Sequence, residues 1–274
     1  MISVLILTKN EEINIKECIR SVSWSDDIFV LDSHSTDRTA DFAMESNAYV
    51  VKRSFDNYAS QRTFGLSLSF KYEWVLMLDA DERSTPELAA EIMNTLGNVG
   101  KEITLFRMRR KDHFLNRWIK RSSGYPTWFG RLFRRGSLSI TREINEEFHT
   151  SGKVGFLQNH INHYPFAKGI SFWFERHNTY SSMEAKLHSQ RNLSRPPLKS
   201  IFRSDPAIRR AGLKSVLYEL PMRPTIVFVY LYFFRLGFMD GQAGYYYCRM
   251  RAAYELMIDA KALEFTCKND TSLP

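Results

Sequence analysis

The stretch Trp74-Val-Leu-Met-Leu-Asp-Ala-Asp-Glu82 decides how the rest of this 274-residue chain is interpreted. Its first five residues are apolar, too few for a helix and rich in strand formers, which predicts a buried strand. Asp79, Asp81 and Glu82 follow at the carboxyl end, where ligands bind in open α/β sheets. Carboxylates gathered there repel one another, so we expect a hard divalent cation, Mg²⁺ or Mn²⁺. A solvated acidic turn is the alternative.

The first hundred residues alternate between apolar strands and amphipathic helices. Strands are predicted at residues 3–7, 27–31, 48–51 and 74–78, and helices at residues 14–22, 36–46, 58–70 and 84–96. Ser84 and Glu87 have capping-box spacing, Pro86 suits a first helical turn, and Gly97 is a natural stop. This order predicts the α/β fold class, with a mostly parallel sheet and helices on both faces.

Three of these strands end in polar clusters, namely Thr8, Asn10 and Glu11, then Asp32, then Asp79 and Asp81. Because the carboxyl ends of parallel strands gather along one edge, we expect these side chains to form one site. The sequence has no Gly-x-Gly-x-x-Gly after the first strand, which disfavours a dinucleotide-binding dehydrogenase, and no P-loop motif. Phosphates would therefore be handled by a metal and by side chains rather than by a glycine-rich loop.

Composition narrows the classes further. The net charge of +8 and the pI near 9.3 favour partners that carry phosphates, in nucleic acid, anionic lipid or sugar nucleotides. Three widely spaced cysteines fit a reducing compartment and argue against a disulfide scaffold or a zinc site. The N-terminus lacks the features of a signal peptide, and no apolar run approaches the ~20 residues that cross a bilayer. We therefore expect a cytoplasmic protein.

Several motifs together resemble the family 2 glycosyltransferases, which have the Rossmann-like GT-A fold. Over the first hundred residues these are Ser3-Val-Leu-Ile-Leu-Thr-Lys-Asn-Glu-Glu12, Leu31-Asp-Ser-His-Ser-Thr-Asp-Arg-Thr39 and Leu78-Asp-Ala-Asp-Glu82. Later pieces resemble a narrower group, the lipopolysaccharide-core transferases of the WaaE/KdtX type. These are Arg131-Leu-Phe-Arg-Arg135, Ile144-Asn-Glu-Glu147, His160-Ile-Asn-His-Tyr164 and Gly237-Phe-Met-Asp-Gly-Gln-Ala-Gly244. Asn145 departs from that group, which often has histidine there, and this leaves the details of acceptor activation open.

The resemblance implies a UDP-sugar donor and assigns residues to it. Thr8, Asn10 and Glu11 match base and ribose contacts, and Asp32 matches a carboxylate that accepts a hydrogen bond from uracil. Gln61 and Arg62 lie in the segment that contacts the nucleotide.

The same resemblance assigns the metal, Mg²⁺ or Mn²⁺. Asp79 matches the first aspartate of the DxD motif, which contacts ribose or metal-bound water, and Asp81 matches the second, which binds the ion. His163 has a counterpart near the diphosphate and is expected beside the metal. Arg131, with its neighbours Arg134 and Arg135, is expected to grip the diphosphate or an anionic acceptor. An exposed basic edge is the alternative for these arginines.

Sugar transfer by direct attack of a hydroxyl inverts the anomeric centre and requires one base. The resemblance indicates Glu146 as that base. From the residues alone, Glu143, Glu147 and Asp112 remain open, and a solvated charged turn is the ordinary interpretation of such glutamates. Residues 109–126 are a candidate lid over the site.

The C-terminal third is predicted to be helical. Helical spacing indicates helices at residues 169–190, 207–220 and 242–263, with a proline-containing linker at 191–206 and an apolar stretch at 225–239. We expect residues 1–166 to form the donor-binding and catalytic domain, and residues 167–274 a membrane-proximal acceptor region. Basic and aromatic amphipathic helices suit an anionic bilayer surface, while an interior helical subdomain or a dimer face is the alternative.

The leading hypothesis is an inverting, metal-dependent transferase that acts at the inner face of the cytoplasmic membrane. It would move a hexose such as glucose from a UDP-sugar to a heptose of the lipopolysaccharide inner core, a lipid-anchored saccharide. A transferase with a polyprenyl-phosphate acceptor is one alternative. A basic nucleic-acid-binding module is another, although no nucleic-acid motif occurs and we expect no such partner. A homo-oligomer is left open.

Overall fold

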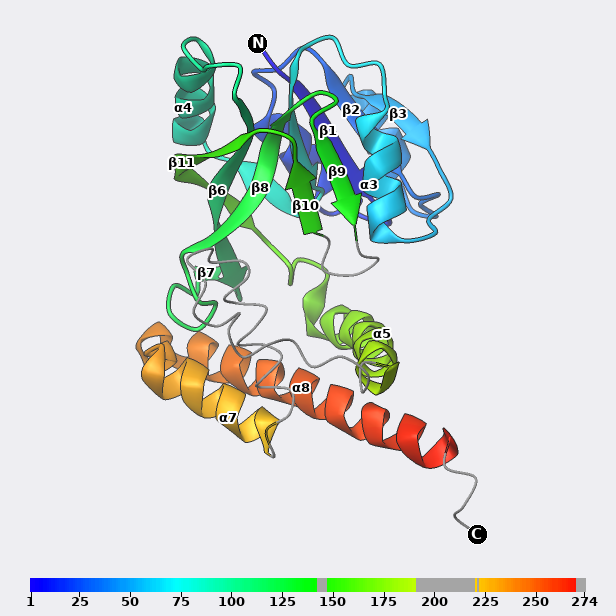
Figure 1. The fold of residues 1–274 in the computed structure, drawn as a ribbon, viewed down its shortest axis with the longest axis vertical. Helices are drawn as coiled ribbons and strands as arrows, with labels where there is room; N and C mark the ends of the chain where they lie inside the picture. Colours follow the sequence, from blue (N-terminus) through cyan, green and yellow to red (C-terminus); the bar gives the residue numbers. More distant parts are fainter. Residues whose placement is uncertain (142–146, 191–219, 221, 270–274) are drawn as a thin grey trace. The chain divides into compact units, whose positions relative to one another are not determined.

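The computed structural model describes residues 1–141, 147–190, 220 and 222–269 (Figure 1). The chain divides into two compact units. The first comprises Met1–Trp118 and Tyr125–Ala167, and the second comprises Ile119–Gly124 and Lys168–Pro274. Nothing in the sequence marks Ile119–Gly124 as part of the second unit.

The first unit begins with four parallel strands and the helices that connect them. In chain order these are β1 (Ser3–Thr8), α1 (Ile15–Ser21), β2 (Ile28–Asp32), α2 (Thr39–Glu45), β3 (Tyr49–Lys52), α3 (Tyr58–Leu66) and β4 (Trp74–Asp79). The strands lie in the order β3-β2-β1-β4, and every neighbouring pair is parallel. The predicted α/β fold class with a parallel central sheet is confirmed (Figure 1).

The remaining strands of this unit extend the sheet and make it mixed. They are β5 (Glu82–Ser84), β6 (Ile103–Phe114), β7 (Arg117–Trp118), β8 (Thr127–Arg134), β9 (Leu138–Thr141), β10 (Glu147–Thr150) and β11 (Lys153–His163). The sheet continues from β4 in the order β8-β6-β11-β5, whereas β9 and β10 form a separate pair. Within the candidate lid, residues 109–112 of β6 pair with β8 or β11, and residues 113–114 pair with β7, so this part of the segment is strand.

Helix α4 (Pro86–Leu96) is present where the sequence predicts it, but its N-cap lies one residue later than expected. Its N-cap is Thr85, whose hydroxyl accepts a hydrogen bond from Leu88 N at 3.2 Å, and not the expected Ser84. Ser84 is instead the last residue of β5. Pro86 lies in the first turn and Gly97 is the C-cap, as expected.

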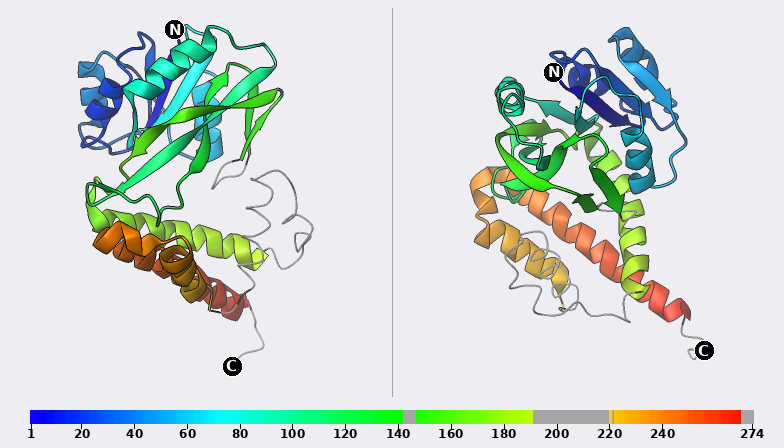
Figure 2. Two further views of the ribbon diagram at one scale, coloured as in Figure 1. Left: turned by 90° about the vertical axis from the view of Figure 1, so that its left-hand side faces the viewer. Right: turned by 45° about the horizontal axis from the view of Figure 1, so that its top comes forward.

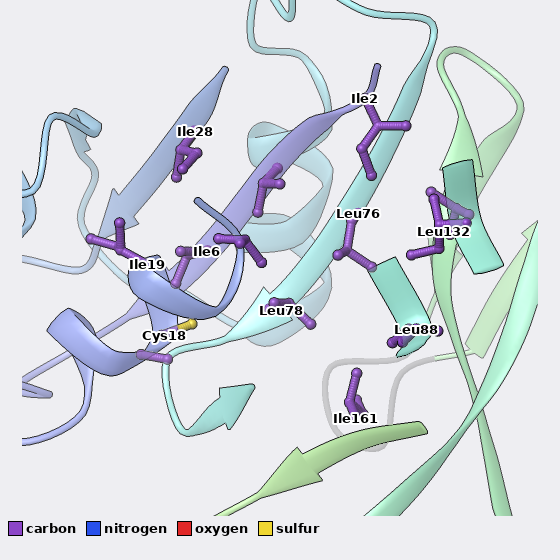
Figure 3. Close-up of a cluster of buried hydrophobic side chains, with 14 of the residues drawn as sticks. Ile2, Ile6, Cys18, Ile19, Ile28, Leu76, Leu78, Leu88, Leu132 and Ile161 are labelled. Carbon is purple, nitrogen blue, oxygen red and sulfur yellow. The ribbon is translucent and has the colours of Figure 1, made fainter. Parts of the chain in front are cut away.

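Helices cover both faces of the parallel strands (Figure 2). Even-numbered residues of β4, Leu76 and Leu78, pack with side chains from α1 and α4, and Figure 3 shows this cluster around Ile6 and Leu88. Odd-numbered residues, among them Met77, face a second cluster with the end of α3 and part of β9. Both clusters are almost fully buried, and each such leucine contributes about 1.5–3 kcal/mol.

The second unit is helical. It contains α5 (Gly169–Gln190), α7 (Arg223–Val229), the π-helical turn η3 (Tyr230–Phe234), the 3₁₀ turn η4 (Gly237–Asp240) and α8 (Gly241–Asn269). The expected helices at 169–190 and 242–263 are present, whereas the expected linker at 191–206 and helix at 207–220 lie outside the described residues. Within the described chain, no helix has the length and apolar content needed to cross a membrane.

Two polar links join the helices of this unit. Arg223 of α7 is almost fully buried, and its guanidinium lies 2.7 Å from Asp259 Oδ1 and 3.2 Å from Glu255 Oε2, both on α8. Lys261 of α8 donates hydrogen bonds to the backbone and side chain of Asn178 on α5. These links fix the positions of α7 and α5 along α8, because each connects a cation of one helix with oxygen atoms of another.

Candidate active site

The register of the parallel strands brings three strand ends to one edge of the sheet. Thr8 of β1 pairs with Asp32 of β2, and Leu7 of β1 pairs with Asp79 of β4. The polar residues that follow these strands therefore start from neighbouring backbone positions, because parallel strands end on the same side of the sheet.

The loops after β1 and β2 are tied to each other by hydrogen bonds. Asn10 has a φ of 54°, a conformation that asparagine tolerates better than most residues. Its backbone N donates to Ser35 Oγ at 2.8 Å, and its Oδ1 accepts from Thr36 N at 2.8 Å. Asp32 is fully buried and accepts hydrogen bonds from both the backbone N and the hydroxyl of Ser35. Asn10 and Asp32 therefore belong to one shared framework.

Thr8 and Glu11 differ in how far their polar atoms are satisfied. The Thr8 hydroxyl is buried and has no hydrogen-bond partner within the described part of the chain, which costs roughly 1–3 kcal/mol. Glu11 lies at the start of the turn before α1, where its Oε2 accepts from Asn14 Nδ2 at 2.7 Å and its backbone N donates to Thr39. The Thr8 hydroxyl therefore keeps unused hydrogen-bonding capacity, whereas Glu11 is engaged through both its side chain and its backbone N.

Helix α3 supplies two buried polar residues to this edge. It begins at Asn57, whose side chain caps the helix by accepting from Ser60 N. Gln61 donates from Nε2 to Ser33 Oγ at 3.0 Å, next to the end of β2. Arg62 donates to Asp79 Oδ1 at 2.9 Å, at the end of β4. One turn of α3 therefore connects two of the strand ends.

Asp79 is held between two arginines. Arg62 binds its Oδ1 at 2.9 Å and Arg131 binds its Oδ2 at 2.8 Å. The same Arg131 nitrogen lies 2.8 Å from Oε1 of the fully buried Glu82, whose other oxygen accepts from Asp79 N at 3.1 Å. Burial alone would raise the pKa of Asp79, but Arg62 and Arg131 hold it far below its ordinary value. The carboxylate is therefore charged and fixed in orientation.

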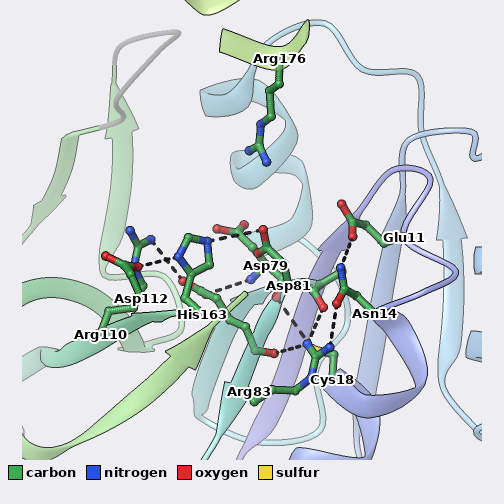
Figure 4. A network of polar contacts seen from close by, with 12 residues as sticks. Glu11, Asn14, Cys18, Asp79, Asp81, Arg83, Arg110, Asp112, His163 and Arg176 are labelled. Atoms are coloured by element: carbon green, nitrogen blue, oxygen red, sulfur yellow. Dashed lines mark hydrogen bonds and ion pairs between the residues drawn. The ribbon is translucent and has the colours of Figure 1, made fainter. Parts of the chain in front are cut away.

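Asp81 faces the imidazole of His163, whose other ring nitrogen contacts Asp112. His163 Nε2 lies 3.4 Å from Asp81 Oδ2, and His163 Nδ1 lies 2.7 Å from Asp112 Oδ1 (Figure 4). Arg110 Nε lies 3.0 Å from the same Asp112 oxygen. The strand pairing explains this line, because β11 brings His163 opposite Glu82 of β5 and opposite Asp112 of β6.

The charges around His163 decide its protonation. Burial and the nearby Arg110 disfavour a charged imidazole, yet Asp81 and Asp112 outweigh them and raise the pKa of His163 to about 9. Burial would raise the pKa of Asp112, but Arg110 and His163 hold it below its ordinary value. Without a bound metal, His163 is therefore a cation at neutral pH that lies between the carboxyl group of Asp81 and the carboxylate of Asp112.

The pair Asp81 and His163 fits a divalent cation. A carboxylate oxygen and an imidazole nitrogen that face each other are ligands suited to Mn²⁺, and Mg²⁺ accepts the carboxylate. Asp112 on the other ring nitrogen is the partner that metal-binding histidines usually have. The described residues contain no group of three or more side chains that could hold an ion alone. Such an ion would therefore rely on substrate phosphates and water for its other ligands.

The structure places the remaining predicted residues as follows. Glu146, the expected base, lies outside the described residues, as does Glu143. Arg134 pairs with Trp74, the first residue of β4, so it lies at the opposite end of that strand from Asp79. Arg110 was absent from the predicted site, and only its spacing of two residues from Asp112 indicated that both lie on the same side of β6.

Comparison with known proteins identifies the chain's relatives. The model of Glycosyl transferase family 2 matches residues 3–163. An uncharacterised glycosyltransferase of Rickettsia prowazekii is 30% identical over 207 residues, covering 68% of this chain and 67% of its own. The lipopolysaccharide core biosynthesis glycosyltransferase LpsC of Rhizobium meliloti is 24% identical over 269 residues, covering 95% of this chain and 91% of its own.

Solved structures match a smaller part of the chain. Glucosyl-3-phosphoglycerate synthase from Mycobacterium tuberculosis, in complex with Mn²⁺, UDP and glucosyl-3-phosphoglycerate, matches with 27% identity and a TM-score of 0.35. The match covers 40% of this chain and 44% of the synthase, less than half of either. The family model and the Rickettsia relative suffice to show that this chain belongs to glycosyltransferase family 2.

Proposed function

We propose that the chain is an inverting, metal-dependent glycosyltransferase that moves a hexose such as glucose from a UDP-sugar to a lipid-anchored saccharide. The observation that supports this most is the line of Asp81, His163 and Asp112, which begins next to the strand edge of Asp32 and Asp79. A family 2 transferase needs a nucleotide pocket and a cation site side by side, and these residues supply ligands of the right kind for both.

The nucleotide would occupy the edge formed by the ends of β1 and β2. Asp32 would accept a hydrogen bond from the uracil ring, and Thr8, Asn10 and Glu11 would contact base and ribose. Gln61 lies next to the end of β2, where it hydrogen-bonds Ser33. Because Asn10, Asp32 and Gln61 are already held by hydrogen bonds to neighbouring residues, little order would have to be created in them on binding.

Asp79 would act beside the ribose as a charged acceptor that cannot rotate. Its two oxygens are engaged by Arg62 and Arg131, so it would meet a ribose hydroxyl or a bound water in one fixed orientation. In this proposal Arg131 positions Asp79, and any contact of Arg131 with the diphosphate would compete with its bonds to Asp79 and Glu82.

Asp81 and His163 would hold Mg²⁺ or Mn²⁺, which as a Lewis acid neutralises charge that develops on a leaving diphosphate. To serve as a ligand, His163 must lose the proton that its neighbours stabilise, because a metal binds the neutral imidazole. Asp112 would keep the remaining ring proton on Nδ1 and so point Nε2 toward Asp81.

Glu146 would take the proton of the attacking acceptor hydroxyl, a step worth about 10²–10⁴-fold in rate. Its assignment rests on the Ile144-Asn-Glu-Glu147 motif. Asp112 is a weaker candidate, because its carboxylate is buried and engaged by His163 and Arg110.

The acceptor would be a heptose of the lipopolysaccharide inner core, reached at the inner face of the cytoplasmic membrane. The relative LpsC, whose name refers to lipopolysaccharide core biosynthesis, supports this choice over a polyprenyl-phosphate acceptor. Membership of a transferase family also favours an enzyme over a nucleic-acid-binding module.

Calorimetry of UDP binding with and without Mn²⁺ tests the proposal. In the wild type we expect Mn²⁺ to tighten UDP binding, and in Asp81→Ala we expect that gain to disappear. Asp26→Asn is the matched control, since Asp26 is exposed in a loop before β2, at the other end of that strand. Failure of the wild type to bind UDP would overturn the proposal and would call for a test with oligonucleotides. Equal binding with and without Mn²⁺ would remove the role of Asp81.

A further inference from the structure

Exposed apolar side chains are concentrated in one short segment of the second unit. Among the described residues, 24 large apolar side chains are exposed, and ten of these lie within residues 222–246. Nine of the ten are called the aromatic face below: Val229, Tyr230, Phe233, Phe234, Leu236, Phe238, Met239, Tyr245 and Tyr246. Phe234 is 76% exposed and Met239 61%. The ring of Tyr232 contacts those of Phe233, Phe238 and Tyr245, so these exposed side chains are neighbours in space, and an exposed apolar patch of this kind marks an interaction site.

The backbone holds these side chains outward. Residues 230–234 form a π-helical turn, a rare element that often occurs at functional sites, and Leu236 follows with a φ of 61°. A Cβ on Gly237 would lie 2.6 Å from the Leu231 carbonyl oxygen, and one on Gly244 would lie 2.2 Å from the Gly237 carbonyl oxygen. The turn is therefore packed backbone against backbone at Gly237 and Gly244, which constrains the conformation of the segment that carries the aromatic face.

A polar anchor fixes the same turn. Asp240 Oδ2 accepts hydrogen bonds from Arg121 N at 2.9 Å, from Ser122 N at 2.8 Å and from Ser122 Oγ at 2.6 Å. All three donors belong to Ile119–Gly124, the segment that groups with this unit. The conformation that presents the aromatic face is thus held by bonds from a distant part of the chain.

The charge of the segment is one-sided. Between Met222 and Met250 the sequence contains one acidic residue, Asp240, whose carboxylate oxygen already accepts three hydrogen bonds. Arg235 lies within the aromatic face, and the exposed Arg249 lies with its guanidinium 5.7 Å from the Phe228 ring. Within this segment the aromatic face therefore has cations in it and beside it, and the single carboxylate, Asp240, is engaged by residues 121 and 122.

We propose that the aromatic face docks the protein onto an anionic lipid bilayer by inserting its side chains into the interfacial region. Phenylalanine, leucine and methionine can enter the boundary of the acyl chains, tyrosine suits the head-group level, and arginine is attracted to anionic lipid. The described helices cannot cross the membrane, so the surface would lie on the bilayer. This inference deepens the proposed location at the membrane by naming the surface that binds lipid, and it uses none of the donor-site residues.

Co-sedimentation with phospholipid vesicles tests the inference on the full-length chain. We expect the wild type to bind vesicles that contain phosphatidylglycerol more strongly than vesicles of phosphatidylcholine alone. The double variant Phe233→Ser/Phe234→Ser should lose roughly tenfold or more of its partition into anionic vesicles, since two of the most exposed rings are removed. The control Met44→Ser/Phe55→Ser removes two exposed apolar side chains from the first unit and should bind like the wild type.

Two further measurements keep the test decisive. UDP calorimetry on every variant reports whether the first unit is folded, and the single variant Phe234→Ser gives a milder change at the most exposed position. Wild type that fails to sediment with anionic vesicles, or a double variant that sediments equally well, would overturn the inference. Sedimentation velocity without lipid should show the same monomer for wild type and variant. A wild-type dimer that the variant loses would instead assign the aromatic face to a second copy of the chain.

Discussion

Replacing Arg131 by methionine should destabilise the protein strongly, because this arginine compensates the charges of two carboxylates, Asp79 and Glu82. Its side chain is 5% exposed, and one nitrogen lies 2.8 Å from both Asp79 Oδ2 and Glu82 Oε1. Glu82 is fully buried, and its next cation, Arg110, is 3.6 Å away. Methionine fills much of the same volume but leaves Glu82 with a poorly compensated charge.

The expected loss in the free energy of unfolding is about 3–5 kcal/mol, the cost of removing one partner from a buried ion pair. Arg62 still compensates Asp79 at 2.9 Å, so the cost falls mainly on Glu82. The double variant Arg131→Met/Glu82→Gln should recover about 1–3 kcal/mol of this, because neighbouring residues in one network couple by such amounts.

Urea unfolding of the ligand-free protein, followed by far-UV circular dichroism, measures these differences. Arg20→Met is the matched control, since Arg20 is 76% exposed and pairs with Glu17 on the surface, where about 0–1 kcal/mol is expected. A loss below about 1 kcal/mol for Arg131→Met, or costs for the two changes that simply add, would refute the reasoning. Normal stability together with weak UDP binding would instead favour a direct grip of Arg131 on the diphosphate.

Three further outcomes are expected. Asp112→Asn should weaken Mn²⁺ binding about 10–100-fold in a titration followed by electron paramagnetic resonance. The control Asp56→Asn, at an exposed position, should bind Mn²⁺ like the wild type. Equal Mn²⁺ affinity in the two variants would contradict the role of Asp112. Mn²⁺ binding at neutral pH should release about one proton, and the affinity for Mn²⁺ should rise with pH up to about 9, because His163 must be deprotonated to bind the metal. Calorimetry in buffers of different ionisation enthalpy measures the number of protons released, and a value of zero would contradict this role of His163. Burial lowers the pKa of His177 to about 4, so between pH 4 and pH 6.5 the unfolded state binds more protons than the folded state. The free energy of unfolding should therefore fall as the pH drops from 6.5 to 4, and it should fall less in His177→Gln than in the wild type.

The N-terminal half could be predicted from the sequence because its signals are local. Each strand from β1 to β4 is a short apolar run that ends in a polar turn, and each helix after it has its own spacing of buried residues. The one-residue error at α4 has the same origin, since Ser84 and Thr85 both have a hydroxyl suited to capping. Pairing with β11 keeps Ser84 in β5 and leaves Thr85 to cap the helix.

The C-terminal half of the first unit could not be predicted in this way, because its strands depend on distant partners. Asp112 and His163 are 51 residues apart and meet only because β6 and β11 are paired in register. No local spacing encodes that register, so Asp112 was considered a base and not the partner of His163. Arg131 similarly resembled a phosphate-binding residue until its burial against Asp79 and Glu82 was visible.

The two aspartates of the Leu78-Asp-Ala-Asp-Glu82 motif show why a motif alone does not assign roles. Asp79 ends β4 and receives two arginines, so its charge is already compensated and its geometry is fixed. Asp81 lies beyond the strand, where β11 brings it a protonated histidine, which would have to give up its proton if it bound the proposed metal. In the proposed function, two identical side chains two residues apart would thus be divided between framework and ligand binding by the cations that the fold places next to each of them.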